Sequence, residues 1–174
     1  MFKAEFKIEG LEEAKKLCST SLMRKSLRST LDKSTTKARQ AIVKEVTSTH
    51  NIAGKDVRAA MTTLRTTADS LETGVQIKGP RLSLLYFKAK QGVLGVTAKV
   101  RKDHDSFYRS AFIVTKWGKV MVRTGKSRLP IQHKAGPSVP MIVDKEPLLN
   151  RVRDAFHAAF DRLFGEEVDK RTRA

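Results

Sequence analysis

"MRKSLRSTLDKSTTKARQAIVKEV", residues 23–46, contains neither glycine nor proline and carries the longest helical pattern of the chain. Apolar or small residues recur in it at steps of four and three, which places them on one face of a helix. These residues are Met23, Leu27, Leu31, Ser34, Ala38, Ile42 and Val46. The segment without glycine or proline extends from Leu11 to Ala53, so we predict a long helix over about residues 20–48.

The predicted helix is long enough that one small chain would not cover its whole apolar face. About 28 helical residues span roughly 40 Å, which is long for a chain of this size. We therefore expect part of the apolar face, with Leu27 and Leu31 as candidates, to contact a second chain.

Upstream of the long helix, apolar and charged side chains alternate in residues 2–8, which predicts a strand with one solvent-exposed face. Gly10 ends this strand, and residues 11–18 have the spacing of a short helix. That helix contains Cys18, the single cysteine, which excludes an internal disulfide and a cysteine-rich zinc site. We interpret Cys18 as a buried thiol.

Downstream, the pattern changes to short strands separated by glycine, proline and polar loops. The clearest element is the hairpin in residues 110–124, whose turn contains Gly118. Residues 88–94 and the polar stretch 102–110 are interpreted as loops. The other predicted elements are a short helix over about residues 54–61, strands at 62–67, 71–78, 82–87 and 95–101, and an amphipathic helix over about 145–164.

These elements predict one α+β domain over residues 1–174, as the length also favours. Its antiparallel sheet packs with the long N-terminal helix and the amphipathic C-terminal helix. Between the hairpin and the last helix lies "RTGKSRLPIQHKAGPSVP", residues 123–140. Because prolines stiffen a chain, we predict a rigid, extended elbow over residues 123–141 that serves as an assembly contact. Its defining residues are Gly125, Pro130, Gly136, Pro137 and Pro140.

The elbow contains Gly125-Lys126-Ser127, which looks like the end of a phosphate-binding loop. Such a loop needs a first glycine five positions before the Gly-Lys pair, so that backbone N–H groups can surround the phosphates. That position holds Val120, which excludes the nucleotide loop.

The residues that carry catalysis or bind metals do not occur in productive spacings. The four histidines lack zinc-ligand spacing, and Asp103, His104 and Asp105 are adjacent, so their side chains point in different directions. Acidic residues are scarce in residues 81–143, and no serine lies in a nucleophile elbow. We therefore predict a protein without catalytic residues, cofactor or metal.

Positive charge dominates the composition, with a formal net charge of +17. Residues 81–143 hold 13 Lys and Arg against 2 Asp and Glu. This excess favours a polyanionic partner, nucleic acid first and an acidic protein surface second. Aromatic residues are few, which favours contact with phosphates over reading of bases. The candidate contact residues are Arg101, Lys102, Arg123, Lys126, Arg128 and Lys134.

The order of segments resembles the minor tail protein Z family of tailed bacteriophages. The resemblance runs from about Gly10 to Phe164 and rests most on "RTGKSRLPI" followed by "GPSVP". It implies a tail-completion protein of long-tailed phages, without catalytic residues, in a homo-oligomeric and commonly sixfold ring at the head-proximal end of the tail. Its partners would be the tail terminator, the head–tail connector and, nonspecifically, the DNA backbone in the channel.

The chain has no run of 18 apolar residues and no signal-peptide pattern, so we expect no membrane partner. We expect synthesis in the reducing host cytoplasm and a final location in the virion. One alternative is a sequence-nonspecific nucleic-acid-binding protein that acts outside a virion and binds duplex as a monomer or dimer. Another is a small enzyme such as a nuclease, which needs a carboxylate cluster.

Overall fold

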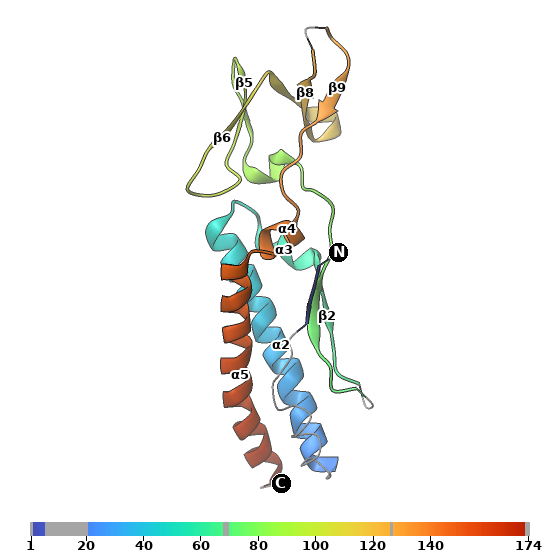
Figure 1. Cartoon of the computed structure of the whole chain (residues 1–174), viewed down its shortest axis with the longest axis vertical. Helices are drawn as coiled ribbons and strands as arrows, with labels where there is room; N and C mark the ends of the chain where they lie inside the picture. The colour runs from blue at the N-terminus through green and yellow to red at the C-terminus, as the bar shows by residue number, and fades with distance from the viewer. Residues whose placement is uncertain (1, 6–20, 68–69, 126, 173–174) are drawn as a thin grey trace. The chain divides into compact units, whose positions relative to one another are not determined.

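The computed structural model describes residues 2–5, 21–67, 70–125 and 127–172 (Figure 1). The chain forms two compact units, although its length predicts one domain. Unit 1 consists of Met1–Ile42, Met61–Lys78 and Asp144–Ala174, and unit 2 consists of Val43–Ala60 and Gly79–Val143. The difference arises because segments distant in sequence gather into separate cores, which chain length does not reveal.

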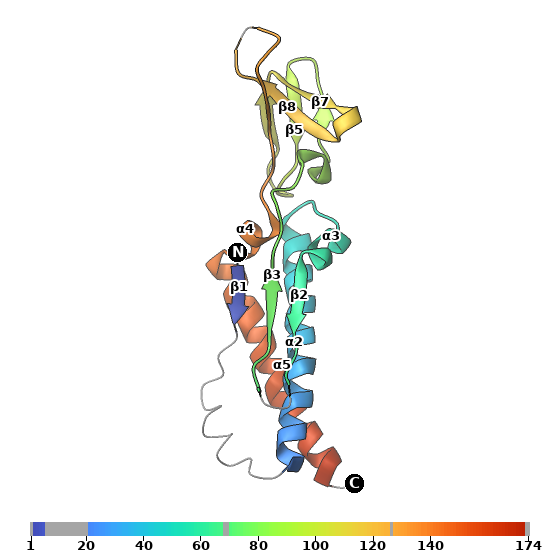
Figure 2. The ribbon, with the colours of Figure 1, turned by 90° about the vertical axis from the view of Figure 1, so that its right-hand side faces the viewer.

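In unit 1, two long helices lie side by side and a three-stranded antiparallel sheet lies against them (Figures 1 and 2). The strand order is β1-β3-β2, with β3 in the centre. Ile77 of β3 is paired with Phe2 of β1 on one side and with Met61 of β2 on the other. The strands are β1 (Phe2–Glu5), β2 (Met61–Leu64) and β3 (Gly74–Ile77). The predicted α+β class is confirmed.

The helix α2 spans Ser21–Thr49, close to the predicted range. Leu27 and Leu31, which we expected to contact a second chain, are each only 1% exposed. The structure corrects that role, because both side chains are already buried within the chain. Figures 1 and 2 show α2 lying beside α5 (Glu146–Thr172) and the three-stranded sheet. The hydroxyls of the buried residues Thr30 and Thr35 donate to the carbonyls of Ser26 and Leu31, at 3.0 and 2.8 Å.

The helix α5 spans Glu146–Thr172, so it starts close to the expected position and continues eight residues beyond the expected end at 164. Gly165 does not end it, because the following turn gains contacts of its own. The Lys33 ammonium donates to the Glu167 carboxylate, and the Ser26 hydroxyl donates to the Glu167 carbonyl. Glu167 is 6% exposed, so its contacts with α2 lie inside unit 1.

Unit 2 contains two three-stranded antiparallel sheets, ordered β4-β5-β6 and β7-β8-β9. The predicted hairpin is confirmed as β7 and β8, with Gly118 at φ 59° in the turn. The strands are β4 (Lys90–Gln91), β5 (Gly95–Ala98), β6 (Ser106–Arg109), β7 (Ala111–Val114), β8 (Lys119–Arg123) and β9 (Ile131–His133). The short helices are α3 (Gly54–Ala59), η1 (Leu84–Phe87), η2 (Thr115–Trp117) and α4 (Val139–Val143).

Three secondary-structure predictions for unit 2 are wrong. Residues 88–94 are not wholly a loop, because Lys90–Gln91 form β4 and pair with β5. Residues 82–87 are not a strand; Leu84–Phe87 form η1, whose three-residue repeat buries Leu84 and Phe87 together. Residues 102–110 are not wholly a loop, because Ser106–Arg109 form β6 and pair with β5. The polar composition of this stretch hid the strand, which pairs with the preceding strand of the chain. The short helix predicted at about 54–61 is confirmed as α3.

The elbow predicted over 123–141 is also not one extended segment. It contains an exposed loop, the strand β9 and the helix α4, which includes Pro140. The strand forms because the chain turns back on itself, and Ile131 pairs with Arg123 of β8. The short helix predicted at 11–18, with Cys18, lies outside the described residues. Within the described part of the chain, no helix is long and apolar enough to cross a membrane.

Candidate nucleic-acid interface

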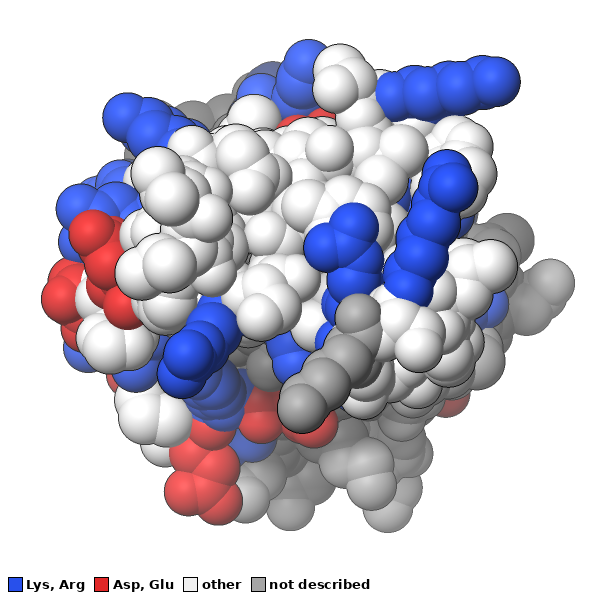
Figure 3. All heavy atoms as spheres, turned by 90° about the horizontal axis from the view of Figure 1, so that it is seen from above, with Lys and Arg blue, Asp and Glu red and all other residues white. Residues whose placement is uncertain are grey.

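Positive charge is concentrated in unit 2. Residues 79–143 contribute 13 Lys and Arg and residues 43–60 another 3, against 4 Asp and Glu in the whole unit. Unit 1 holds 19 Lys and Arg against 14 Asp and Glu, so its charges nearly balance. In the end-on view of Figure 3, Lys and Arg side chains project from a largely uncharged face, and Asp and Glu lie toward its margin.

One group of predicted contact residues lies at the loop between β8 and β9. Arg123 ends β8, and its guanidinium lies over the Phe112 ring, 5.0 Å from the centroid. Arg128 is exposed in the loop itself, and Lys126 lies outside the described residues. The Pro130 carbonyl closes the loop by accepting hydrogen bonds from Thr124 N and Oγ1, at 3.3 and 3.0 Å. Arg123 and Arg128 therefore lie on a loop whose two ends are joined by hydrogen bonds.

A second group lies near the opposite ends of these strands. Lys134 follows β9; its backbone N donates to the Val120 carbonyl at 2.9 Å, and its Nζ lies 5.7 Å from the Tyr108 ring centroid. Arg101 forms an ion pair with Asp103, Nη2 to Oδ2, at 3.1 Å. The backbone N of Lys102 donates to the carbonyl of Thr49, the last residue of α2, at 3.0 Å.

The structure therefore does not bring the five described members of the six predicted cations into one cluster. Lys134 bonds to Val120, whereas Arg123 is three residues further along β8. At about 3.3 Å per residue, the two groups are separated by roughly 10 Å along the strand. An extended partner such as a nucleic-acid strand can contact both groups at once. The spacing therefore favours binding at two places over binding at a single site.

The predicted elbow residues divide in the same way between surface and interior. Gly125 and Pro130 are exposed in the loop between β8 and β9, where the Leu129–Pro130 peptide bond is cis. Gly136 is buried, and its backbone N donates to the Leu82 carbonyl at 2.8 Å. Pro137 also packs into unit 2, with its carbonyl accepting from Leu82 N at 3.4 Å. Of these elbow residues, Gly125 and Pro130 are therefore exposed, whereas Gly136 is buried and Pro137 is partly buried.

Sequence reasoning missed exposed apolar residues of unit 2. Val93 and Leu94 lie on the turn between β4 and β5 and are 104% and 73% exposed. Leu129, beside the cations of the β8–β9 loop, is 66% exposed. The glycines at 92 and 95 are the sequence signal that could have placed the first two on a turn.

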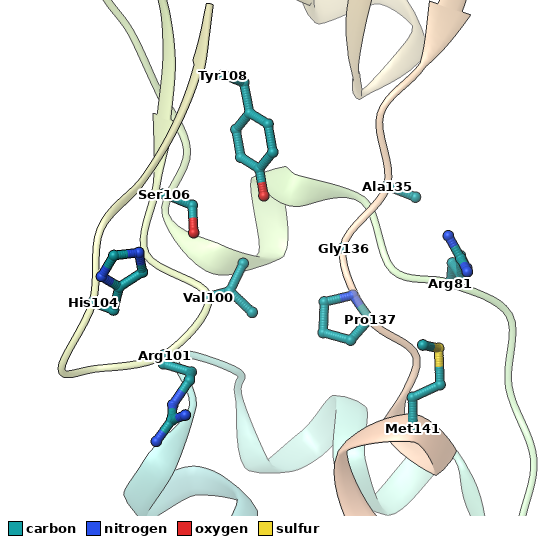
Figure 4. Close-up of a pocket in the computed structure, with 10 residues that line it drawn as sticks. All are labelled: Arg81, Val100, Arg101, His104, Ser106, Tyr108, Ala135, Gly136, Pro137 and Met141. Atoms are coloured by element: carbon teal, nitrogen blue, oxygen red, sulfur yellow. The ribbon is translucent and has the colours of Figure 1, made fainter.

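Sequence reasoning also missed a pocket of about 320 Å³ in unit 2 (Figure 4). The residues of β6 and of the preceding loop form one wall, and residues 135–137 form the facing wall. Arg101 is the one predicted contact residue in the described part of the chain that lines it, and Figure 4 shows its guanidinium pointing away from the cavity. The polar residues that line it and were not predicted are Arg81, His104, Ser106 and Tyr108.

The acidic residues near these cations are already paired. Asp103 contacts Arg101, and Asp105 contacts Lys99, Nζ to Oδ1, at 3.3 Å. No group of three His, Cys, Asp or Glu that could hold a metal ion occurs in the part of the chain that the structure describes. Comparison with protein-family models, with curated proteins and with solved structures finds no match to this chain.

Proposed function

We propose that this chain is a structural virion protein of a tailed phage that completes the head-proximal end of the tail. It acts without catalysis, as one subunit of a homo-oligomeric, sixfold ring around the DNA channel, next to the terminator and connector proteins. The observation that carries the proposal is the partition of charge, with 16 Lys and Arg against 4 Asp and Glu in unit 2. The resemblance of segments to the minor tail protein Z family supports the same conclusion.

The geometry of unit 2 suits contact with a phosphate backbone. Arg128 and Lys134 are exposed, and neither forms an ion pair with a residue that the structure describes. In a ring every such cation is repeated by symmetry, so weak contacts with phosphates add together. A channel that lets DNA slide has to hold it weakly, so we expect poor DNA binding by one isolated subunit.

A second candidate is a sequence-nonspecific nucleic-acid-binding protein that acts outside a virion. The observation that favours it is the exposure of aromatic rings beside the cations of unit 2. Tyr86, Phe107 and Trp117 are 52%, 56% and 55% exposed. Bases of a single strand stack on such rings. This candidate requires strong binding by a monomer or dimer.

The test combines electron microscopy of the purified protein with a triple substitution in the loop, Arg123→Ser, Lys126→Ser and Arg128→Ser. The unmodified protein should form ring-shaped particles. If the loop lies in the channel, tails that contain the variant should join heads but retain or eject DNA abnormally. Variant tails that fail to join heads, with DNA affinity of the ring unchanged, would assign the loop to a protein interface.

The control is a triple substitution of exposed cations in unit 1, Lys25→Ser, Lys37→Ser and Arg153→Ser, which should leave DNA retention unchanged. The proposal fails if the purified protein is a monomer that binds DNA tightly. It also fails if nuclease or nucleotide-hydrolysis activity disappears on replacement of one Asp or Glu.

A further inference from the structure

The pocket of about 320 Å³ in unit 2 has hydrogen-bond donors that point into it. Figure 4 shows the hydroxyls of Ser106 and Tyr108, both on β6, directed toward the cavity. Both residues are partly buried. Neither hydroxyl makes a hydrogen bond with any residue that the structure describes. Two partly buried donors of this kind are available to a ligand.

The charged side chains at the pocket are cations. Arg81 lines it, and the ammonium of Lys134 lies 5.7 Å from the centroid of the Tyr108 ring. His104 also lines it and adds a ring N–H donor. No Asp or Glu among the described residues lines it, and the two acids of the adjacent loop are paired with Arg101 and Lys99. An anion that enters the pocket therefore meets donors and cations without a competing carboxylate.

The size and the walls of the pocket restrict the ligand further. A volume of about 320 Å³ is that of a small-molecule site and exceeds what a single inorganic ion fills. Val100, Pro137 and Met141 give it apolar surface. The ligand thus has an anionic group and an organic body that contacts these side chains.

We propose that this pocket binds the phosphate group of a phosphate ester. The donors lie on several chain segments, with Ser106 and Tyr108 on β6, His104 before it and Arg81 on a separate segment beside residues 135–137 (Figure 4). A tetrahedral phosphate presents its oxygens on several sides of the phosphorus, whereas the two oxygens of a carboxylate accept hydrogen bonds within one plane. The inference does not depend on the ring or on the virion, because all the residues belong to unit 2 of one subunit.

The experiment is a titration of the full-length protein with thymidine monophosphate, followed by calorimetry. Tyr108→Phe removes the hydroxyl and keeps the ring beneath Lys134, and it should weaken binding about tenfold, the loss of one hydrogen bond to a charged group. Arg81→Gln should weaken it to a similar extent. The matched control is Tyr86→Phe, because Tyr86 is exposed and does not line the pocket; it should bind like the unmodified protein.

Competition experiments identify the recognised group and its source. Inorganic phosphate should displace the nucleotide, and acetate at the same concentration should not. Displacement by a short DNA duplex would assign the pocket to phosphates of a strand, and displacement by inorganic phosphate alone would assign it to a free phosphate ester. Undiminished binding by Tyr108→Phe with an unchanged circular dichroism spectrum, or equal displacement by acetate, would overturn the proposal.

Discussion

At the scale of single residues, Gly136 is the glycine among those described in unit 2 at which an added Cβ would lie nearest to a side chain. A Cβ built there would lie 2.6 Å from Cε2 and 3.0 Å from Cδ2 of Phe87. Phe87 is fully buried at the end of η1, so its ring has little space to move. Gly136 also lines the pocket, together with Ala135 and Pro137.

We predict that Gly136→Ala lowers the free energy of unfolding by about 1–3 kcal/mol, the usual cost of forcing an extra methyl group into a packed core. Chemical denaturation followed by circular dichroism measures the change. The matched control is Gly125→Ala, since a Cβ at Gly125 meets no atom within 4 Å; its effect should stay within about 0.5 kcal/mol. Equal stabilities of the two variants would show that Gly136 is not packed against Phe87.

At the scale of elements, α5 is notable for continuing through Gly165 to Thr172. The turn around this glycine has an ion pair between Arg162 and Glu166, Nε to Oε1, at 3.9 Å. Two residues beyond Gly165, the side chain of Glu167 contacts Lys33 of α2. The tertiary contacts offset the weak helix propensity of glycine at this position.

We predict that Gly165→Ala stabilises the protein by about 0.5–1 kcal/mol, because glycine loses more backbone entropy than alanine on entering a helix. A Cβ at Gly165 meets no atom within 4 Å, so the added methyl group causes no clash. Thermal and chemical unfolding measure the gain. The reverse change at an exposed site of the same helix, Ala158→Gly, should cost a similar amount. A destabilised Gly165→Ala variant would contradict a continuous helix here.

At the scale of the whole molecule, the two units differ in charge far more than in size. Unit 2 carries 16 Lys and Arg against 4 Asp and Glu, and unit 1 carries 19 against 14. A polyanion is attracted to a dense field of one sign, and mixed charges largely cancel at a distance. The difference predicts that nucleic acid binds through unit 2.

We predict that the triple Ser variant at Arg123, Lys126 and Arg128 lowers both the affinity of the assembled protein for duplex DNA and its dependence on salt. Each lost phosphate contact reduces the slope of log K against log salt concentration by about 0.9. Fluorescence anisotropy at several salt concentrations measures this slope. The unit 1 variant at Lys25, Lys37 and Arg153 loses the same formal charge, and its slope should remain unchanged. Equal losses in both variants would indicate that only total charge matters.

The sequence by itself determined the features that depend on neighbours along the chain. The four- and three-residue spacing that includes Leu27 and Ile42 predicted α2, and the apolar run before Gly118 predicted the β7–β8 hairpin. Local periodicity and turn chemistry decide such elements, so they can be seen without coordinates. The excess of positive charge in residues 81–143 was visible for the same reason, since it is a matter of composition.

Only the tertiary structure decided the features that depend on distant residues. The sheet of unit 1 pairs β1 with β3, which joins Phe2 to Ile77, and the contact between α2 and α5 joins Lys33 to Glu167. The pocket likewise forms because Tyr108 faces residues 135–137 across the fold. Periodicity shows that a face is apolar or polar, but it carries no information about which segment covers that face. A distant segment covers it when the free energy of packing exceeds the entropic cost of closing the intervening chain into a loop.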